Sequence, residues 1–361
     1  HSFFLQQNHV NSLIVNKASR GMLKQELTRI GYPVMDVAGY HEGEKLVCGM
    51  RQFSAAGFPV VLRDYQQQAV QAFDPKQTGY QGSGIIVMPC GAGKTIVGIS
   101  ALTRLQCATL ILTHNMTSVQ QWKREIMDKT NIAPEWIGEY SGERKEVRPI
   151  TIATYQILTH RKSKEAEFQH IRLFQERDWG FIIYDEVHLL PAPVFRATAE
   201  IQATRRMGLT ATLVREDGRE EDVFSLIGPK CYEVPWKELE QRGYIAQVDC
   251  VEIRVPLSEQ IRRQYLSSGA REKNRIAGEN PAKLHAIQDI LHRHKDLPSL
   301  IIGQYIDQLQ HISQSLGAPL ITGKTPQAER ERLYAQFKKG EIPCIVVSKV
   351  ANFAVDLPNA S

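Results

Sequence analysis

A short segment in the first third of the chain has the residue types and the spacing that a nucleotide's phosphates require. It reads Met-Pro-Cys-Gly-Ala-Gly-Lys-Thr over residues 88–95, between an apolar run and a helix-like segment. In such a strand–turn–helix arrangement, backbone N–H groups and the positive end of the helix converge on phosphate oxygens. Lys94 can reach the β- and γ-phosphates, and the Thr95 hydroxyl can bind Mg²⁺. The expected ATP-binding residues of this loop are Pro89, Cys90, Gly91, Ala92, Gly93, Lys94 and Thr95.

The loop departs from the full phosphate-binding pattern in one place. Met88 stands where the pattern has a glycine, so a chance glycine turn is the alternative interpretation of the loop by itself. Gly91 and Gly93 nevertheless let the backbone approach a ligand closely, because they carry no Cβ atom. A second segment is needed to decide between the two interpretations.

Two adjacent carboxylates, Asp185 and Glu186, provide that second segment. They end an apolar, β-type run that begins at Phe181. From this position Asp185 can hold Mg²⁺ through water, and Glu186 can orient or deprotonate an attacking water. Acidic residues at strand ends are usually only solvated, so neither would be informative alone. Together with the phosphate loop they predict an ATP and Mg²⁺ site in which Lys94, Asp185 and Glu186 are catalytic.

Residues before and after these two motifs fit the same chemistry less specifically. Arg63 and Gln66, upstream of the loop, are also expected to bind ATP. The Gln66 amide could pair with adenine, although an exposed helix residue is the alternative. Thr210, Ala211 and Thr212 end a later strand-like run with hydroxyls and small residues that can slide against a neighbour. Gln66 is thus a candidate for base recognition, and residues 210–212 are candidates for a sliding contact with a neighbouring segment.

The segment after the second strand-like run offers groups that suit a nucleic acid. His114, Asn115 and Gln121 supply hydrogen-bonding groups for a phosphodiester backbone, and Trp122 supplies an aromatic ring. For Trp122 we favour packing in the core over stacking on a base.

The order of the elements predicts an α/β fold with parallel sheets flanked by helices. Strands are expected at 85–89, 109–113, 150–154, 181–185 and 206–210, with helices around 96–105, 117–129, 155–160 and 194–203. A second unit is expected to contain strands at 247–255, 299–304, 318–322 and 343–348 and helices near 282–294, 305–316 and 326–338. A helix at 19–30 is expected in a small N-terminal part. The predicted domains are 1–58, 59–240 and 241–361.

Composition excludes several classes of protein. The 361 residues are too many for one ordinary core, and 42% hydrophobic with 23% charged residues is typical of globular domains. A formal charge of +5 permits a polyanionic partner without requiring one. The six cysteines have no metal-ligand spacing, so we expect free, buried thiols in a reducing cytosol. No apolar run approaches the roughly 18 residues that span a membrane, and we expect no membrane association.

Taken together, these segments resemble the XPB family of superfamily-two DNA helicases, in its bacterial and archaeal branch. The resemblance covers roughly residues 60–361, and its longest motifs are Asp-Glu-Val-His-Leu-Leu-Pro-Ala-Pro at 185–193 and Gly-Leu-Thr-Ala-Thr-Leu-Val-Arg-Glu-Asp-Gly at 208–218. Further matching segments are Tyr155-Gln156, 222–230, Ile302-Gly303-Gln304-Tyr305 and 348–353. The fold implied is two RecA-like P-loop domains, the second incomplete, after a small N-terminal remnant.

The resemblance also implies roles for individual residues. Gln66 would recognise adenine, His188 would join the catalytic set and couple hydrolysis to the last strand, and residues 210–212 would relay the nucleotide state. The triplet Arg215-Glu216-Asp217 matches the family's RED element, which is associated with strand separation; a solvated loop is the alternative. The residues expected to contact nucleic acid are His114, Asn115, Gln121, Thr154, Gln304 and Lys349.

Two further segments have weaker counterparts in the family. Residues 1–58 resemble the end of a module that engages damaged or distorted DNA. The basic segment 258–283 occupies the place of a thumb-like insertion, and a phosphate-contacting loop and a solvated surface are both open for it. The family's last motif, which supplies arginine fingers, would follow Ser361. We therefore expect a longer parent chain, and weak turnover without that motif, since an arginine finger contributes about 10³–10⁵ in rate.

The function expected is that of an ATP-dependent 3′–5′ DNA helicase or translocase in nucleotide-excision-type DNA repair. The expected cofactors are ATP and Mg²⁺, and the expected partners are duplex, forked or damaged DNA and a nuclease or repair factor. Two alternatives stay open: a double-strand DNA translocase that does not separate strands, and a nucleotide-gated scaffold that recruits a nuclease. We expect a cytoplasmic, nucleoid-associated prokaryotic protein.

Overall fold

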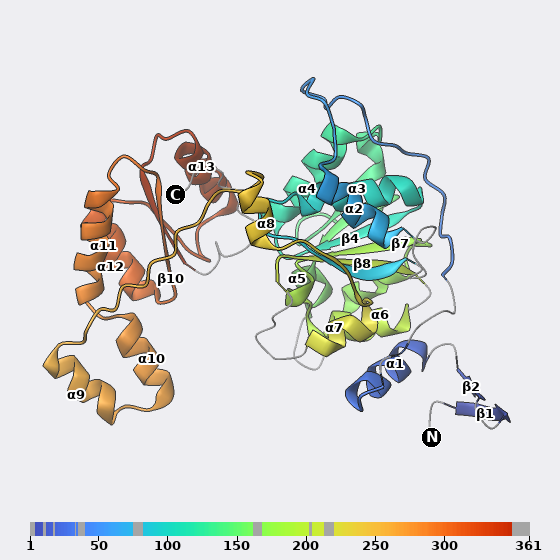
Figure 1. Ribbon diagram of the computed structural model, residues 1–361, viewed down its shortest axis with the longest axis horizontal. Coiled ribbons are helices and arrows are strands. Elements are labelled where there is room, and N and C mark those ends of the chain that lie inside the picture. The colour runs from blue at the N-terminus through green and yellow to red at the C-terminus, as the bar shows by residue number, and fades with distance from the viewer. Residues whose placement is uncertain are drawn as a thin grey trace. The chain divides into compact units, whose positions relative to one another are not determined.

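The computed structural model describes residues 4–9, 12–16, 19–32, 34, 40–74, 82–161, 168–201, 204–212 and 220–348. The chain divides into two compact units, His1–Gln247 and Val248–Ser361. Each is an α/β arrangement around a parallel sheet (Figure 1), as the sequence predicts. No helix among the described residues is long and apolar enough to cross a membrane.

The first unit is built on a seven-stranded parallel sheet in the order β5-β6-β4-β7-β8-β3-β9. Its strands are β3 (Ser83–Val87), β4 (Thr109–Thr113), β5 (Ile137–Tyr140), β6 (Ile150–Thr154), β7 (Phe181–Asp185), β8 (Arg205–Thr210) and β9 (Lys230–Glu233). Every residue of β4 and β6 is buried, because helices cover both faces of such a sheet. The predicted strands that carry the motifs are therefore confirmed, whereas β5 and β9 were not expected.

Helices cover the two faces of this sheet (Figure 1). One face carries α2 (Asp64–Phe73), α3 (Lys94–Leu105) and α4 (Met116–Lys129), and the other carries α5 (Tyr155–Leu158), α6 (Ala192–Glu200) and α7 (Glu220–Leu226). Side chains alternate along each strand, so Ile111 and Ile183 face the first core while Leu110 and Ile182 face the second. The remaining elements are η2 (Pro134–Trp136), η3 (Gln169–Phe174), η4 (Val187–Leu189) and α8 (Trp236–Gln241).

The N-terminal part consists of the hairpin β1 (Phe4–His9) and β2 (Ser12–Val15) and the helix α1 (Arg20–Arg29). α1 packs closely on α6, since a Cβ atom on Gly21 would lie 2.4 Å from the Ala199 carbonyl oxygen. Gln25 donates a hydrogen bond to Asp222 at 2.7 Å. Bridges from Lys45 to Cys107 and from Met50 to Thr130 attach the following segment to the same unit.

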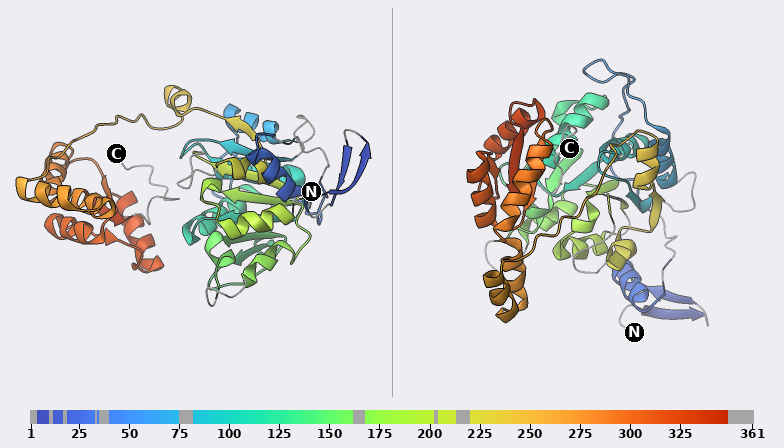
Figure 2. Two further views of the ribbon diagram at one scale, coloured as in Figure 1. Left: turned by 90° about the horizontal axis from the view of Figure 1, so that it is seen from below. Right: turned by 60° about the vertical axis from the view of Figure 1, so that its left-hand side comes forward.

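The second unit has a three-stranded parallel sheet in the order β10-β12-β11. Its elements are α9 (Glu259–Ser267), α10 (Ala270–Gly278), α11 (Ala282–Arg293), β10 (Ser299–Gly303), α12 (Ile306–Leu316), β11 (Leu320–Ile321), α13 (Gln327–Lys338) and β12 (Cys344–Ser348). Along β12, Val346 packs with Leu309 of α12, whereas Ile345 packs with Phe337 of α13. The basic segment forms α9 and α10, neither of which has a buried residue, and both extend away from the sheet of their unit (Figure 2).

Two predictions need correction. The strand expected at 247–255 is wrong, because none of the described strands pairs with this segment and Val248, Val251 and Ile253 are exposed. Its alternating apolar residues imitate a strand, but a strand needs a neighbour to satisfy its backbone. The second correction concerns the cysteines, which were expected to be free and buried. They form no disulfide, but only Cys48 and Cys107 are buried, and Cys90 and Cys250 are exposed.

Candidate functional site

The phosphate loop lies between β3 and α3, at the carboxyl end of the sheet. Its two glycines adopt left-handed backbone conformations, with φ of 76° at Gly91 and 83° at Gly93. Gly93 is the N-cap of α3, so Lys94 and Thr95 occupy the first turn of a 12-residue helix. The free N–H groups of that turn give the loop the cradle that an anionic phosphate requires.

Gln66 is buried, and its side chain is hydrogen-bonded to the phosphate loop. Its Nε2 donates to the Ala92 carbonyl oxygen at 2.9 Å, and the Tyr65 hydroxyl donates to the same oxygen at 3.0 Å. The Gln66 Oε1 accepts the backbone N–H of Arg63 at 2.9 Å and thereby caps α2. The alternative of an exposed helix residue is therefore wrong for Gln66, although it describes Gln67. Recognition of adenine by Gln66 stays a prediction.

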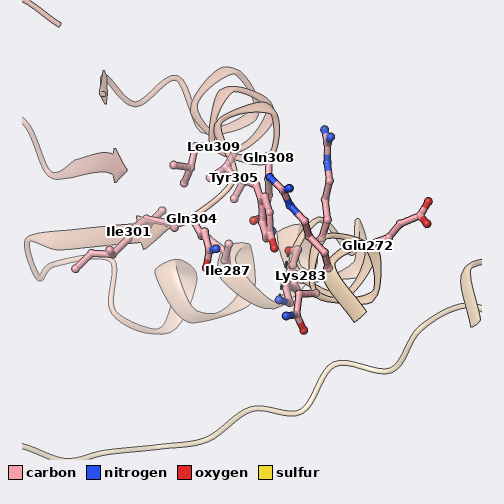
Figure 3. Close-up of a pocket in the computed structure, with 15 residues that line it drawn as sticks. Glu272, Lys283, Ile287, Ile301, Gln304, Tyr305, Gln308 and Leu309 are labelled. Atoms are coloured by element: carbon pink, nitrogen blue, oxygen red, sulfur yellow. Dashed lines mark hydrogen bonds between the residues drawn. The ribbon is translucent and has the colours of Figure 1, made fainter. Parts of the chain in front are cut away.

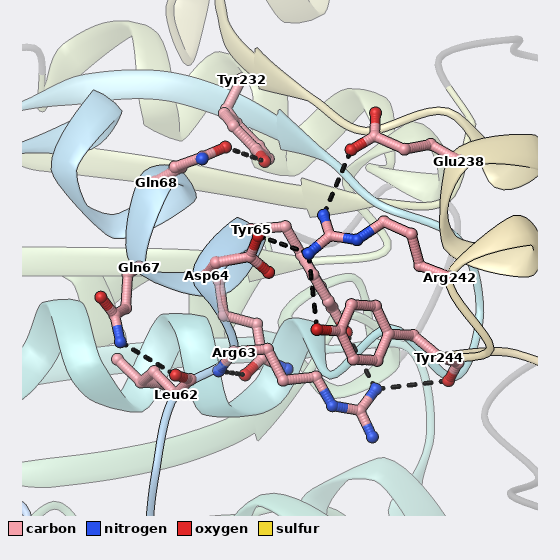
Figure 4. Close-up of polar contacts among 11 residues, drawn as sticks. Leu62, Arg63, Asp64, Tyr65, Gln67, Gln68, Tyr232, Glu238, Arg242 and Tyr244 are labelled. Carbon is pink, nitrogen blue, oxygen red and sulfur yellow. Dashed lines mark hydrogen bonds and ion pairs between the residues drawn. The ribbon is translucent and has the colours of Figure 1, made fainter.

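A tyrosine that the sequence does not single out lies beside this arrangement. The Tyr244 ring is 5.3 Å from the Tyr65 ring, and the guanidinium groups of Arg63 and Arg242 each lie 4.8 Å from its centroid (Figure 4). Arg63 also donates to the Tyr244 carbonyl oxygen at 3.3 Å, and Arg242 pairs with Asp64. No periodicity or motif in the sequence indicates Tyr244, because it is far from α2 along the chain and approaches α2 only in the folded protein.

The two predicted carboxylates end β7 next to the loop. Lys94 Nζ lies 3.5 Å from Glu186 Oε1, and Glu186 adopts a left-handed conformation with φ of 48°, which is unusual for a residue with a side chain. Asp185 Oδ2 accepts the Trp122 indole N–H at 2.9 Å, and its Oδ1 accepts the Glu186 backbone N–H at 3.1 Å. Burial, followed by repulsion from Glu186, raises the pKa of Asp185 to about 6.

His188 connects the carboxylates to the last predicted strand. Its Nδ1 lies 2.9 Å from the Thr210 hydroxyl and 3.5 Å from Glu186 Oε2. Thr210 is paired with Val87 of β3, and its carbonyl oxygen accepts the backbone N–H of Met88 at 2.9 Å. The backbone N–H of Thr212 donates to the Thr210 hydroxyl at 3.2 Å, and Ala211 lies between the two residues. Arg215, Glu216 and Asp217 lie outside the described residues.

The residues predicted to contact nucleic acid lie in several places. His114 and Asn115 follow β4, and Thr154 ends the neighbouring β6, since Thr113 and Thr154 are in register. Asn115 Oδ1 caps α4 by accepting the Ser118 N–H, and the Thr154 hydroxyl caps α5 by accepting the Ile157 N–H. Gln121 is half-buried on α4. Burial lowers the pKa of His114.

Gln304 belongs to the second unit, where it lines a groove of about 1060 Å³ (Figure 3). The groove lies among α10, α11, the end of β10 and the start of α12. Its basic residues are Arg271, Arg275 and Lys283; Arg275 pairs with Asp307 at 2.9 Å and with Glu279 at 3.1 Å. Lys349, the last residue predicted for nucleic-acid contact, lies outside the described residues. No cluster of metal-ligating side chains of the kind found in metalloproteins occurs among the described residues.

Family models match most of the chain. Residues 59–215 match the type III restriction enzyme res subunit, and residues 239–361 match the ERCC3/RAD25/XPB C-terminal helicase.

Curated relatives match over nearly the whole chain. A DNA 3′–5′ helicase XPB of Mycobacterium tuberculosis is 49% identical over 97% of this chain and 62% of the relative. A putative DNA 3′–5′ helicase Rad25 of Haloarcula marismortui is 36% identical over 96% of this chain and 52% of the relative. The XPB/SSL2 subunit of the general transcription and DNA repair factor IIH of Saccharomyces cerevisiae is 34% identical over 98% and 42%. The chain thus spans less than two thirds of the length of these relatives.

Solved structures show the same fold at low identity. A fragment of a putative HsdR subunit of a type I restriction enzyme from Vibrio vulnificus has a TM-score of 0.54 at 17% identity, covering 84% of this chain and 57% of that one. Saccharomyces cerevisiae Dbp5 bound to RNA and ADP BeF3 has a TM-score of 0.54 at 13% identity, covering 82% and 73%.

Proposed function

Because the chain belongs to the XPB family of superfamily-two DNA helicases, we propose that it is an ATP-driven 3′–5′ DNA helicase that opens or remodels duplex DNA during repair. The observation that carries the proposal is one continuous set of polar contacts. It runs from Lys94 to Glu186, from Glu186 to His188 and from His188 to Thr210. The residues proposed for phosphate binding and for water activation thereby contact each other and, through His188, the end of β8.

The residues present suit ATP and Mg²⁺. The helix N-terminus after Gly93 suits the phosphates, the Lys94 amine could pair with their oxygens, and the Thr95 hydroxyl and Asp185 carboxylate are hard oxygen ligands of the kind Mg²⁺ prefers. Bound Mg²⁺ would neutralise charge that develops on the phosphate oxygens. Glu186 would then hold the attacking water and take its proton. Lys94 would leave its ion pair with Glu186 and contact the phosphates instead.

His188 is proposed to couple hydrolysis to movement on DNA. It contacts both Glu186 and Thr210, so a change in the position of Glu186 alters a hydrogen bond at the end of β8. Residues 211–217 follow directly along the chain, and they include the triplet proposed to act in strand separation. A coupling residue should therefore affect DNA-dependent turnover more than nucleotide binding.

DNA is proposed to contact the ends of β4 and β6 in the first unit and the groove beside Gln304 in the second. Both places present side-chain amides, hydroxyls or cations at the carboxyl ends of parallel strands, where such sheets bind ligands. The naming of XPB relatives as subunits of a DNA repair factor supports a repair-factor or nuclease partner. The higher identity to a bacterial relative, 49% over 97% of the chain, supports the proposal that the protein acts at a prokaryotic nucleoid.

A second candidate is translocation on duplex DNA without strand separation. It is favoured by the match of residues 59–215 to a restriction enzyme subunit. A forked DNA with a labelled strand distinguishes the two candidates, because a translocase displaces a bound obstacle but not the strand.

The experiment that tests the proposal measures nucleotide binding and ATP hydrolysis with and without forked DNA, beside the variant Glu186→Gln. We expect hydrolysis that is weak without the arginine-finger motif but still DNA-stimulated, and that falls by about 10²–10⁴ in the variant, since general base catalysis contributes on that order. Nucleotide binding should survive the substitution. An equal rate in the two proteins, or a chain that binds no nucleotide, would contradict the proposal.

A further inference from the structure

Trp122 lies in the middle of α4 with only 1% of its surface exposed. Its indole N–H donates a 2.9 Å hydrogen bond to Oδ2 of Asp185. The other oxygen of that carboxylate accepts the Glu186 backbone N–H at 3.1 Å. Both oxygens of Asp185 therefore have a donor, and one of these donors comes from another element of the fold.

The indole ring is also held from the opposite side. A Cβ atom at position 98 would lie 2.6 Å from the Cη2 atom of Trp122, so the ring lies directly on Gly98 of α3. Glycine is a poor helix former, and here its lack of a side chain leaves room for the ring. Because α3 begins with Lys94 and Thr95, Trp122 packs on the helix that carries one half of the proposed nucleotide site and donates to a carboxylate of the other half.

Burial removes base stacking as a role for Trp122, which agrees with the preference for core packing at the sequence level. Packing alone, however, does not explain the indole N–H. A buried tryptophan of the ordinary kind is Trp179, which is 2% exposed and donates to the Leu173 carbonyl oxygen at 2.8 Å. Trp122 instead directs its N–H to a side-chain carboxylate that can rotate.

We propose that Trp122 is a positioning residue for the carboxylate that binds the metal. The hydrogen bond stops rotation of Asp185 about its side-chain bonds and keeps its oxygens in the orientation that the nucleotide-bound Mg²⁺ needs. Donors behind a metal ligand act in this way in many metal sites. The inference rests on the proposed function, because it assigns Asp185 to the metal.

The test compares Trp122→Phe with Trp179→Phe. Each substitution keeps an aromatic ring and removes one buried indole N–H, so both should lower thermal stability. The measurement is the Mg²⁺ concentration at half-maximal binding of a fluorescent ATP analogue, without turnover. We expect this concentration to rise about 10-fold or more in Trp122→Phe and to stay at the wild-type value in Trp179→Phe. Equal shifts in the two variants would overturn the inference.

A double-mutant cycle provides an independent check. In an Asp185→Asn background the carboxylate is already lost, so adding Trp122→Phe should produce little further change in the Mg²⁺ requirement. Full additivity of the two substitutions would mean that Trp122 acts by some other route. A wild-type chain that binds no nucleotide at any Mg²⁺ concentration would instead contradict the proposed function, which keeps the two failures distinct.

Discussion

The two glycines of the phosphate loop allow a matched prediction, because they share a backbone conformation but not their surroundings. Both have φ near 80°, at 76° for Gly91 and 83° for Gly93. An added Cβ atom at Gly91 would meet only a methyl group of Ile245, at 4.0 Å. At Gly93 it would lie 2.5 Å from Nε2 of Gln66, so the Gln66 side chain would have to move.

The expected losses of stability differ for that reason. Left-handed backbone costs a residue with a side chain about 1–2 kcal/mol, and Gly91→Ala should lose this amount. Gly93→Ala loses it as well and also breaks the hydrogen bond from Gln66 to the Ala92 carbonyl oxygen. Leaving a buried polar group without its partner costs about 1–3 kcal/mol more. The total for Gly93→Ala is then roughly 2–5 kcal/mol.

Urea unfolding followed by tryptophan fluorescence measures these losses in the first unit alone. All four tryptophans, at positions 122, 136, 179 and 236, belong to that unit. The third variant needed is Gln66→Ala combined with Gly93→Ala. Since the shorter side chain removes the clash, adding Gly93→Ala to this background should cost only the backbone contribution of about 1–2 kcal/mol.

Two results would refute the reasoning. One is an equal loss of stability for Gly91→Ala and Gly93→Ala, which would mean that the contact with Gln66 has no energetic consequence. The other is an undiminished cost of Gly93→Ala in the Gln66→Ala background, which would place the clash elsewhere.

Three other predictions concern coupling, thiols and pH. His188→Ala should reduce DNA stimulation of ATP hydrolysis about 10-fold through loss of the bond to Thr210, with nucleotide affinity retained; lost affinity would contradict this. A maleimide should modify only the exposed Cys90 and Cys250 of the native protein, because burial raises the pKa of the other four thiols. Mg²⁺–ATP should protect Cys90, and mass spectrometry measures both results. The folded-state pKa of Asp185 is raised to about 6. The protonated side chain therefore contributes its full stability below pH 4, and this contribution is lost when the carboxyl ionises as pH rises through 6. Asp185→Asn should therefore stabilise the metal-free protein by about 1–3 kcal/mol more at pH 8 than at pH 4 in urea titrations; a pH-independent difference would contradict this.

The fold was predictable where a segment's local pattern matches its environment. The strands β4, β6 and β7 are short runs rich in apolar and β-branched residues that the sheet buries on both faces. The strand β5 was missed because its residues include Gly138 and Glu139, which disfavour a strand locally. In the fold Glu139 is buried but satisfied by Gln120 at 3.0 Å and Ser141 at 2.9 Å. A short-range pattern cannot contain such partners.

The candidate site also has features that the sequence predicts and features that only the fold provides. By itself the sequence predicted the chemistry proposed for the site, because Lys94, Asp185 and Glu186 are recognisable from residue type and from their place after apolar runs. Only the tertiary structure decided how these groups are held: that Gln66 supports the loop from behind, that Tyr244 lies beside it, and that the Trp122 indole holds Asp185. The physical reason is that a motif requires only neighbours along the chain, whereas the orientation of a carboxylate depends on donors that folding brings from distant segments.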